Sequence, residues 1–282
     1  MKRTVILFVL FAVMLTIPMN AENITFVDSN VKAICVANWD KDGDGELSTE
    51  EAAAVQALGE VFRGKTNIGS FPELKYFTGL TAIDEYAFSG SSIGPEIVVP
   101  GNVKSLEAFC FNNCQQLRRV ILEEGVEVVG FDAFFGPVTF LSLPASLTYI
   151  ASTAINPYID ANPGTNIVVR EGDLTVLVHT KEPASIDYYA FYYLFGEGHL
   201  VVPQGSKDAY KTAKAWSHFG EYLELGDVNR DGRLDIADVT LLIAFIQGRE
   251  HTETEARIAD VNGDGVLDGE DVEQLCQYLL GF

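Results

Sequence analysis

The chain has 282 residues, of which 40 are acidic and 19 are basic, and its formal net charge is −21. Hydrophobic residues make up 48% of the chain and charged residues 21%, so it can bury a core and is not a disordered acidic polymer. Nucleic acids and anionic lipid surfaces are disfavoured as ligands, because both are bound by clustered Lys and Arg.

The first 21 residues have the pattern of a secretory signal peptide. Lys2 and Arg3 precede an apolar run from Val5 to Ile17, and the small residue Ala21 ends the segment. The run is shorter than the ~20 residues that a membrane-spanning helix needs. We therefore expect residues 1–21 to be removed and the remaining chain to be secreted or displayed at the cell surface, with no stable membrane insertion.

The remaining acidity is concentrated in two short segments. Residues 26–64 carry 8 acidic and 3 basic side chains, and residues 222–282 carry 14 acidic and 4 basic ones. Together these two segments hold −15 of the net charge of −21. Such dense clusters of carboxylates indicate sites for hard cations rather than general solubility.

Residues 40–51 form a twelve-residue acidic loop with side-chain oxygens at alternate positions. Gly45 stands at the sixth position, where the chain must turn sharply, and Glu51 stands at the twelfth, where both oxygens can chelate one cation. The pattern resembles the calcium loop of an EF-hand; the alternative is a solvated acidic turn. The resemblance implies one Ca²⁺ with these ligands: Asp40, Asp42, Asp44, Glu46 and Glu51.

Helices are expected on both sides of this loop. Val31–Asn38 is predicted to be a short helix before it, and Thr49 can cap a second helix after it. The apolar residues of that second helix are Ala52, Val55, Leu58, Val61 and Phe62.

A repeat occupies the middle of the chain. One motif, an apolar residue followed four positions later by Ala or Cys and then a hydrophobic residue, begins at Ile83, Leu106, Val129, Ile150 and Ile186. A second column of short apolar segments keeps the same register and begins at Ile97, Val120, Leu141 and Leu200. A period of 20–29 residues with apolar columns predicts a solenoid of leucine-rich-repeat type.

The pattern resembles the BspA-like leucine-rich repeats of bacterial surface proteins, over roughly residues 66–221. Within that region, residues 167–178 are predicted to be a hairpin with a Glu-Gly-Asp turn, and residues 204–220 an amphipathic helix that closes the stack. Residues 22–65 are expected to cap the other end, because a solenoid needs polar terminal caps. The cysteines Cys35, Cys110, Cys114 and Cys276 are expected to be small buried apolar residues, with a disulfide as the alternative.

Two further acidic loops of twelve residues start at Asp227 and Asp260, 33 residues apart. Both have Asp at the twelfth position, and apolar helices are expected after them over Val239–Gln247 and Val272–Leu280. The predicted ligands of the first loop are Asp227, Asn229, Asp231, Arg233, Asp235 and Asp238. Those of the second are Asp260, Asn262, Asp264, Val266, Asp268 and Asp271, and Arg233 and Val266 would contribute backbone carbonyls.

Residues 222–282 resemble a type I dockerin, a duplicated calcium loop–helix module. The resemblance implies two bound Ca²⁺ ions and a partner, the cohesin domain of a scaffold protein, in assemblies that degrade polysaccharides. In this family the tenth and eleventh loop positions contribute to the choice of cohesin, and here they are Ile236, Ala237, Gly269 and Glu270. The two pairs differ between the halves, which argues against a symmetric, two-way mode of binding.

The expected fold class is α+β: a leucine-rich-repeat solenoid of short stacked strands with a small all-α calcium-binding domain at the C-terminus. Catalysis is not expected. Gly90–Gly94 has the spacing of a hydrolase nucleophile elbow, but it lies at a repeat corner and lacks the strand–turn–helix context. The four histidines match no metal or triad pattern.

Two binding surfaces are considered. The outward-facing strand residues Val98, Ile121, Ser142 and Val201 could bind a ligand, and so could the aromatic run Tyr188, Tyr189, Tyr192 and Tyr193, whose alternative role is in the core.

The sequence therefore predicts a secreted, non-catalytic interaction protein. Its repeats would bind a protein or glycan, and its C-terminal module would attach it to a cohesin-bearing partner, in polysaccharide breakdown by resemblance. The alternative is a surface adhesin that binds host protein or matrix, with the C-terminal module as a structural calcium domain. An unrecognised glycosidase or peptidase is a third possibility.

Overall fold

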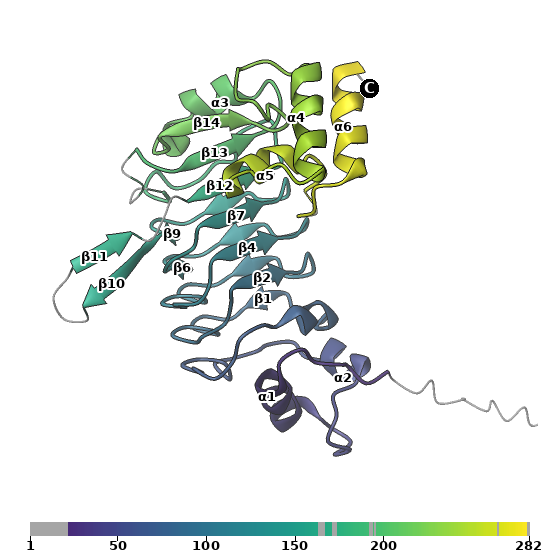
Figure 1. Ribbon diagram of the computed structural model, residues 1–282. Coiled ribbons are helices and arrows are strands. Elements are labelled where there is room, and N and C mark those ends of the chain that lie inside the picture. The colour runs from purple at the N-terminus through teal and green to yellow at the C-terminus, as the bar shows by residue number, and fades with distance from the viewer. Residues whose placement is uncertain are drawn as a thin grey trace, which may run out of the picture.

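The computed structural model describes residues 22–162, 167–170, 174–191, 194, 196–263 and 265–280. The described chain forms an elongated stack of coils with a small helical module at its C-terminal end (Figure 1). The expected fold class, a solenoid of stacked strands with a helical C-terminal region, is confirmed. None of the described helices combines the length and the apolar character that crossing a membrane requires.

Two parallel sheets run along the stack. The shorter sheet has four strands, β1 (Ala82–Ile83), β3 (Ser105–Leu106), β5 (Val128–Val129) and β8 (Tyr149–Ile150). The longer sheet has six strands in the order β2 (Glu96–Val99), β4 (Arg119–Leu122), β7 (Phe140–Leu143), β12 (Thr175–Val178), β13 (His199–Val202) and β14 (Glu221–Glu224). Strands β6 (Phe134–Phe135) and β9 (Ile155–Asn156) form a separate parallel pair. In the sequence, β6 follows β5 and β9 follows β8 of the shorter sheet.

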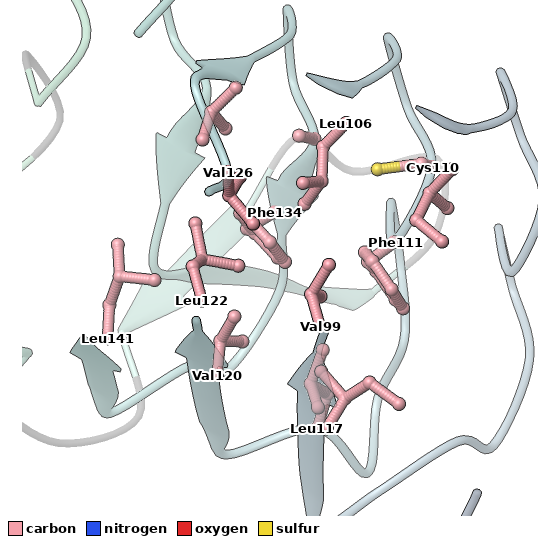
Figure 2. Close-up of a cluster of buried hydrophobic side chains, with 14 of the residues drawn as sticks. Val99, Leu106, Cys110, Phe111, Leu117, Val120, Leu122, Val126, Phe134 and Leu141 are labelled. Carbon is pink, nitrogen blue, oxygen red and sulfur yellow. The ribbon is translucent and has the colours of Figure 1, made fainter. Parts of the chain in front are cut away.

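The predicted repeat register is confirmed strand by strand. Ile97 lies opposite Val120, and Val120 lies opposite Leu141, as the second apolar column requires. Because the pairing is parallel and in step, every coil turns the same position inward, and the interior fills with apolar columns. Figure 2 shows Phe111, Phe134 and Leu106 gathered in this interior with Val99 and Leu122.

A ladder of phenylalanine rings crosses the stack from coil to coil. Phe88 and Phe111 stack with centroids 5.0 Å apart and planes 5° apart, and Phe111 and Phe134 stack at 5.4 Å and 8°. At the opposite side Phe88 stacks on Phe62 at 5.0 Å, so the N-terminal segment joins the same ladder. The hydrophobic residue that ends each repeat motif therefore forms the central column of the core.

One turn position adopts a left-handed backbone without glycine in four successive coils. Tyr86 and Phe109 both have φ of 60°, and Asp132 and Thr153, which follow in successive coils, have φ of 47° and 53°. Such angles are costly for side chains with a Cβ. The neighbouring coils offset the cost by hydrogen bonds such as Phe109 N–H to the carbonyl of Phe131 at 2.9 Å.

The degenerate part of the repeat region differs from the predicted hairpin. Residues 167–178 do not pair with each other: β11 (Ile167–Arg170) pairs antiparallel with β10 (Tyr158–Asn162), whereas β12 pairs parallel with β7 and β13. The expected Glu-Gly-Asp turn lies outside the described residues. Strand β12 is buried along its whole length, so it is the missing repeat strand between Leu141 and Leu200 rather than half of a hairpin.

The ends of the stack also differ from expectation in detail. Helix α1 (Ser29–Trp39) is found as predicted, but α2 (Thr49–Ala53) is short and capped by Ser48, not Thr49, because Glu51 completes a capping box with Ser48. The expected closing helix over 204–220 is reduced to α3 (Lys207–Thr212) and the short 3₁₀ helix η3 (Lys214–Trp216). A further 3₁₀ helix, η1, spans Pro72–Tyr76 near the N-terminal end.

The end of the repeat stack lies a few residues beyond Glu221, where we expected the boundary. Strand β14 (Glu221–Glu224) pairs with β13 over its full length, so it belongs to the stack. The helical module that follows contains α4 (Ile236–Ile246), α5 (Glu253–Ala259) and α6 (Gly269–Leu280). Of the cysteines, Cys35, Cys110 and Cys114 are buried as expected, Cys276 is partly exposed, and all four are free thiols.

The phenylalanine ladder predicts where the stack is most sensitive. Replacing Phe111 by Ala removes the middle ring, so the free energy of unfolding should fall by about 3–5 kcal/mol. Urea denaturation followed by circular dichroism measures the loss. Phe131→Ala is the matched control: this ring is 44% exposed and meets Phe109 edge to face, so a loss of about 1 kcal/mol is expected. Equal losses in the two variants would contradict the central role of the ladder.

Candidate calcium sites

The N-terminal loop, residues 40–51, places its first three acidic side chains together. Carboxylate oxygens of Asp40, Asp42 and Asp44 lie within 4.8 Å of one another. Asp40 accepts hydrogen bonds from the backbone N–H of Gly43 at 2.7 Å and of Gly45 at 2.9 Å. Glycine at these two positions has φ of 76° and 87°, which allows the backbone to fold around the carboxylates.

The twelfth residue closes this loop from the far side. Glu51 accepts from the backbone N–H of Lys41 at 2.7 Å and of Ser48 at 2.9 Å, and the Ser48 amide above all lowers the pKa of Glu51 to about 2. The carboxylate is therefore charged at neutral pH and held at the loop. Glu46, another predicted ligand, pairs its side chain with Lys32 of α1 at 2.6 Å. It stands at the seventh position of the loop, which contributes its backbone carbonyl.

The two C-terminal loops repeat this hydrogen-bonding pattern. At the first position, Asp227 accepts from Gly232 N–H at 3.0 Å and Asp260 accepts from Gly265 N–H at 2.9 Å. At the third and fifth positions of the first loop, Asn229 accepts from Asp231 N–H at 2.8 Å and Asp231 from Arg233 N–H at 2.9 Å. In the first loop the Asp231 and Asp238 carboxylates also lie near that of Asp227, as cation ligands do.

Aspartate at the twelfth position reaches the same amides as Glu51 does. Asp238 accepts from Asn229 N–H at 3.1 Å and Asp235 N–H at 2.9 Å. Asp271 accepts from Asn262 N–H at 3.2 Å and Asp268 N–H at 3.0 Å. The ninth residue caps the following helix and the twelfth is its third residue, so one capping box orients the ligand as well as the helix in the first loop.

The burial of the first and twelfth carboxylates of each C-terminal loop indicates that a cation belongs in each loop. Asp227, Asp238, Asp260 and Asp271 are each at least 95% buried. Oδ1 of Asp227 is buried without a hydrogen-bond partner, and burial, followed by the nearby Asp238 and Asp231 carboxylates, raises the Asp227 pKa. An unpaired buried carboxylate oxygen is costly, and Ca²⁺ would satisfy it. The donor set thus fits the ion that the spacing implies.

Asp264 and Val266 complete the predicted ligands of the loop 260–271. The side chain of Asp264 lies outside the described residues. Val266 is exposed, and the expected ligand there is its backbone carbonyl. When bound, Ca²⁺ would supply positive charge between the buried carboxylates, and the loops' own residues would hold it through side-chain and backbone oxygens.

The predicted partner residues lie on the surface at the starts of two helices. Ile236 and Ala237 begin α4 and Gly269 and Glu270 begin α6, and all four are exposed. Ile236 is 70% exposed.

Helix α5, in the segment 248–256 and just after it, was not predicted. The segment was expected only to join the two calcium halves. A sequence signal was present, since Thr252 and Glu255 have the spacing of a capping box, and the structure shows both of its hydrogen bonds.

The hydrolase-like segment Gly90–Gly94 is followed by strand β2 rather than by a helix, so it lacks the strand–turn–helix context of a nucleophile elbow. Ser92 holds the nucleophile position of that pattern; it is half-buried, and its backbone N–H donates to the carbonyl of Lys65 at 2.9 Å. Ser91 beside it is buried, with its hydroxyl 3.8 Å from Sγ of Cys114. His179 does contact a serine, with Nε2 2.9 Å from Oγ of Ser142; Ser142 is buried on the outer face of the long sheet, and His179 is exposed just after strand β12.

The Asp227 site predicts how the module responds to metal. Asp227→Asn keeps the size of the side chain but removes a charged ligand, so Ca²⁺ affinity at that loop should fall about tenfold or more. Calorimetric titration with CaCl₂ measures it, and addition of chelator should reduce the helical signal of the wild-type chain. Asp208→Asn, in an exposed acidic residue of α3, is the control and should bind Ca²⁺ like the wild type. Equal Ca²⁺ binding by the two variants would show that Asp227 is not a ligand.

Comparison with known families agrees with this geometry. Residues 225–280 match the family model described as Dockerin type I domain. Residues 60–158 match the BspA type Leucine rich repeat region, in six copies. No curated protein matches the chain. The EF-hand resemblance of residues 40–51 stays a prediction. The resemblances to BspA-type repeats and to a type I dockerin are confirmed, and the chain carries a BspA-type leucine-rich repeat region followed by a type I dockerin domain.

Proposed function

We propose that the protein is a secreted, non-catalytic subunit that its calcium-loaded dockerin attaches to a cohesin-bearing scaffold or surface protein, while its repeats bind a protein or glycan. The observation that carries the proposal is the pair of calcium loops with exposed residues at the starts of α4 and α6. Dockerin type I domains bind cohesins, and both matched families are typical of extracellular or cell-surface proteins. Association with polysaccharide breakdown rests on this resemblance alone.

The two helices that would face a cohesin differ in chemistry. The exposed side of α4 is apolar, with Ile236 70% and Ile243 38% exposed. The matching positions of α6, 33 residues later, are Gly269 and Cys276, and the intervening exposed residues Glu270 and Glu273 are acidic. An apolar, desolvated centre is what most stable protein interfaces are built around. We therefore assign cohesin contact chiefly to α4, in a single orientation.

The alternative is an adhesin in which the dockerin is a structural calcium domain. The exposed tyrosines favour keeping this alternative: Tyr188 and Tyr189 are 37% and 49% exposed, and their rings contact each other edge to face at 5.0 Å. Lys214 lies 4.7 Å from the centroid of the Tyr188 ring. This aromatic surface is suited to stacking on a sugar or a peptide side chain. Tyr192 and Tyr193 lie outside the described residues.

Capture of surface and secreted proteins by the immobilised full chain tests the proposal. A cohesin-bearing protein should be retained with Ca²⁺ and released by chelator. Ile236→Asp should weaken retention at least tenfold, because it puts a charge into the apolar patch, while an acid in the first helical turn leaves α4 stable. Val27→Asp is the matched control, since Val27 is 72% exposed and lies in the N-terminal segment.

Two results would contradict the docking proposal. One is retention of the same partners with and without Ca²⁺. The other is equal retention by the Ile236→Asp and Val27→Asp variants. Either result would favour the adhesin, with the repeats as the binding part.

A further inference from the structure

The outer face of the long sheet is covered by the chain's own dockerin. Helix α5 lies across strands of this sheet, between them and the α4–α6 pair (Figure 1). Ile258 of α5 is fully buried in an apolar cluster with residues of the sheet and the following turn, which are Phe140, Leu177, Val201, Leu223 and Leu225. The backbone adds a hydrogen bond from Gly226 N–H to the carbonyl of Ile258 at 2.8 Å. The outward-facing strand residues predicted as a ligand surface, Ile121 and Val201 among them, belong to this cluster instead.

A charged network surrounds the apolar contact. Oε1 of Glu253, at the start of α5, accepts hydrogen bonds from Nη1 of Arg119 at 2.9 Å and from Nη2 of Arg257 at 2.7 Å. Arg119 belongs to strand β4 and Arg257 to α5, so Glu253 joins the two modules. Both guanidinium groups also lie over the ring of Phe140, 4.9 Å and 4.4 Å from its centroid.

The same network reaches one of the two calcium loops of the dockerin. Nη1 of Arg257 lies 3.6 Å from Oδ2 of Asp260, the first ligand of the loop 260–271. In this loop, a Cβ built on Gly263 would lie 3.2 Å from Cε1 of His179 in the stack, and one on Gly265 would lie 4.0 Å from Nη2 of Arg119. Gly232, the counterpart of Gly265 in the loop 227–238, has nothing within 4 Å. Only the second loop therefore lies against the repeats at this position.

We propose that calcium binding in the loop 260–271 and docking of α5 on the outer sheet face are thermodynamically linked, so that the repeat stack and the second dockerin half form one calcium-dependent unit. Ca²⁺ fixes the backbone around Asp260, Gly263 and Gly265, and these residues lie beside Arg257, His179 and Arg119. Ordering the loop for the ion therefore also orders the surface that meets the stack. By reciprocity, docking raises the affinity of the loop for Ca²⁺ by the same factor.

Glu253 explains why docking of α5 raises, rather than lowers, the Ca²⁺ affinity of the loop 260–271. Arg257 next to Asp260 would by itself repel an incoming Ca²⁺. Glu253 binds the Arg257 guanidinium through two nitrogens, Nη2 at 2.7 Å and Nε at 3.0 Å, and thereby compensates its charge. Loss of the Glu253 charge removes both the compensation and the bridge to Arg119, and both changes lower Ca²⁺ affinity. Glu253 is thus a positioning residue for the site, not a ligand.

Hydrogen exchange of the full chain, measured by mass spectrometry across a Ca²⁺ titration, tests the linkage. Peptides covering 40–51, 227–238 and 260–271 report the midpoint of each loop separately. In the wild type, Ca²⁺ should also slow exchange in β4 and β7. Glu253→Gln should move the midpoint of the loop 260–271 at least about fivefold higher, leave that of 40–51 unchanged, and abolish the effect on β4 and β7.

The chain offers a matched control for Glu253. Glu96 also pairs with Arg119, with its Oε2 2.8 Å from Nε, but it lies in strand β2 within the stack. Glu96→Gln removes the same kind of charge and should leave the midpoint of the loop 260–271 within twofold of the wild type. Arg119→Gln removes the stack's partner of Glu253 and leaves the sequence of the dockerin unchanged. Combined with Glu253→Gln, it should add less than its separate effect.

Two outcomes would overturn the inference. One is a midpoint for the loop 260–271 that agrees within twofold between the wild type and Glu253→Gln. The other is a wild-type chain in which Ca²⁺ protects the dockerin but leaves β4 and β7 unchanged. Neither outcome depends on a cohesin, so the proposal that the dockerin binds a cohesin is tested separately.

Discussion

The in-step parallel pairing of the long sheet is the constraint on which the rest of the structure depends. Ile97, Val120 and Leu141 lie in one row, and the row continues through Val176 and Leu200 to Tyr222. A slip of one residue at any pair would turn the buried positions outward. The same register places Arg119 and Phe140 side by side on the outer face. The register of the repeats therefore forms the surface on which α5 packs as well as the core.

Periodicity predicted the parts of the fold that repeat. The first two apolar columns were found because each recurs at a nearly constant shift, and the calcium loops because their ligands alternate at fixed positions. The hairpin predicted for β12 is wrong, because alternating apolar residues specify a strand but not its partner. The intervening β10–β11 pair displaces β12 along the sequence, and only the sheet shows that Val176 fills the row between Leu141 and Leu200.

The contacts that join the two modules could not be predicted in the same way. Helix α5 has seven residues and a weak apolar pattern, although its capping box marked its start. Arg119 and Glu253 are 134 residues apart, and nothing local in the sequence relates them. The left-handed backbone at Tyr86 and Phe109 was also beyond local rules, which reserve such angles for glycine. Hydrogen bonds from the neighbouring coils impose that conformation.

The direct run of strand β14 into the dockerin has a geometric consequence. Only Leu225 and Gly226 separate Glu224 from Asp227, and their amides are bonded to Val202 and to Ile258. The two modules therefore do not rotate freely about the junction, unlike domains joined by flexible Gly- or Ser-rich linkers. A chain anchored through α4 would hold its repeats at one fixed angle to the anchor. The positions that its ligands can occupy would then follow from the shape of a rod rather than from the statistics of a flexible polymer.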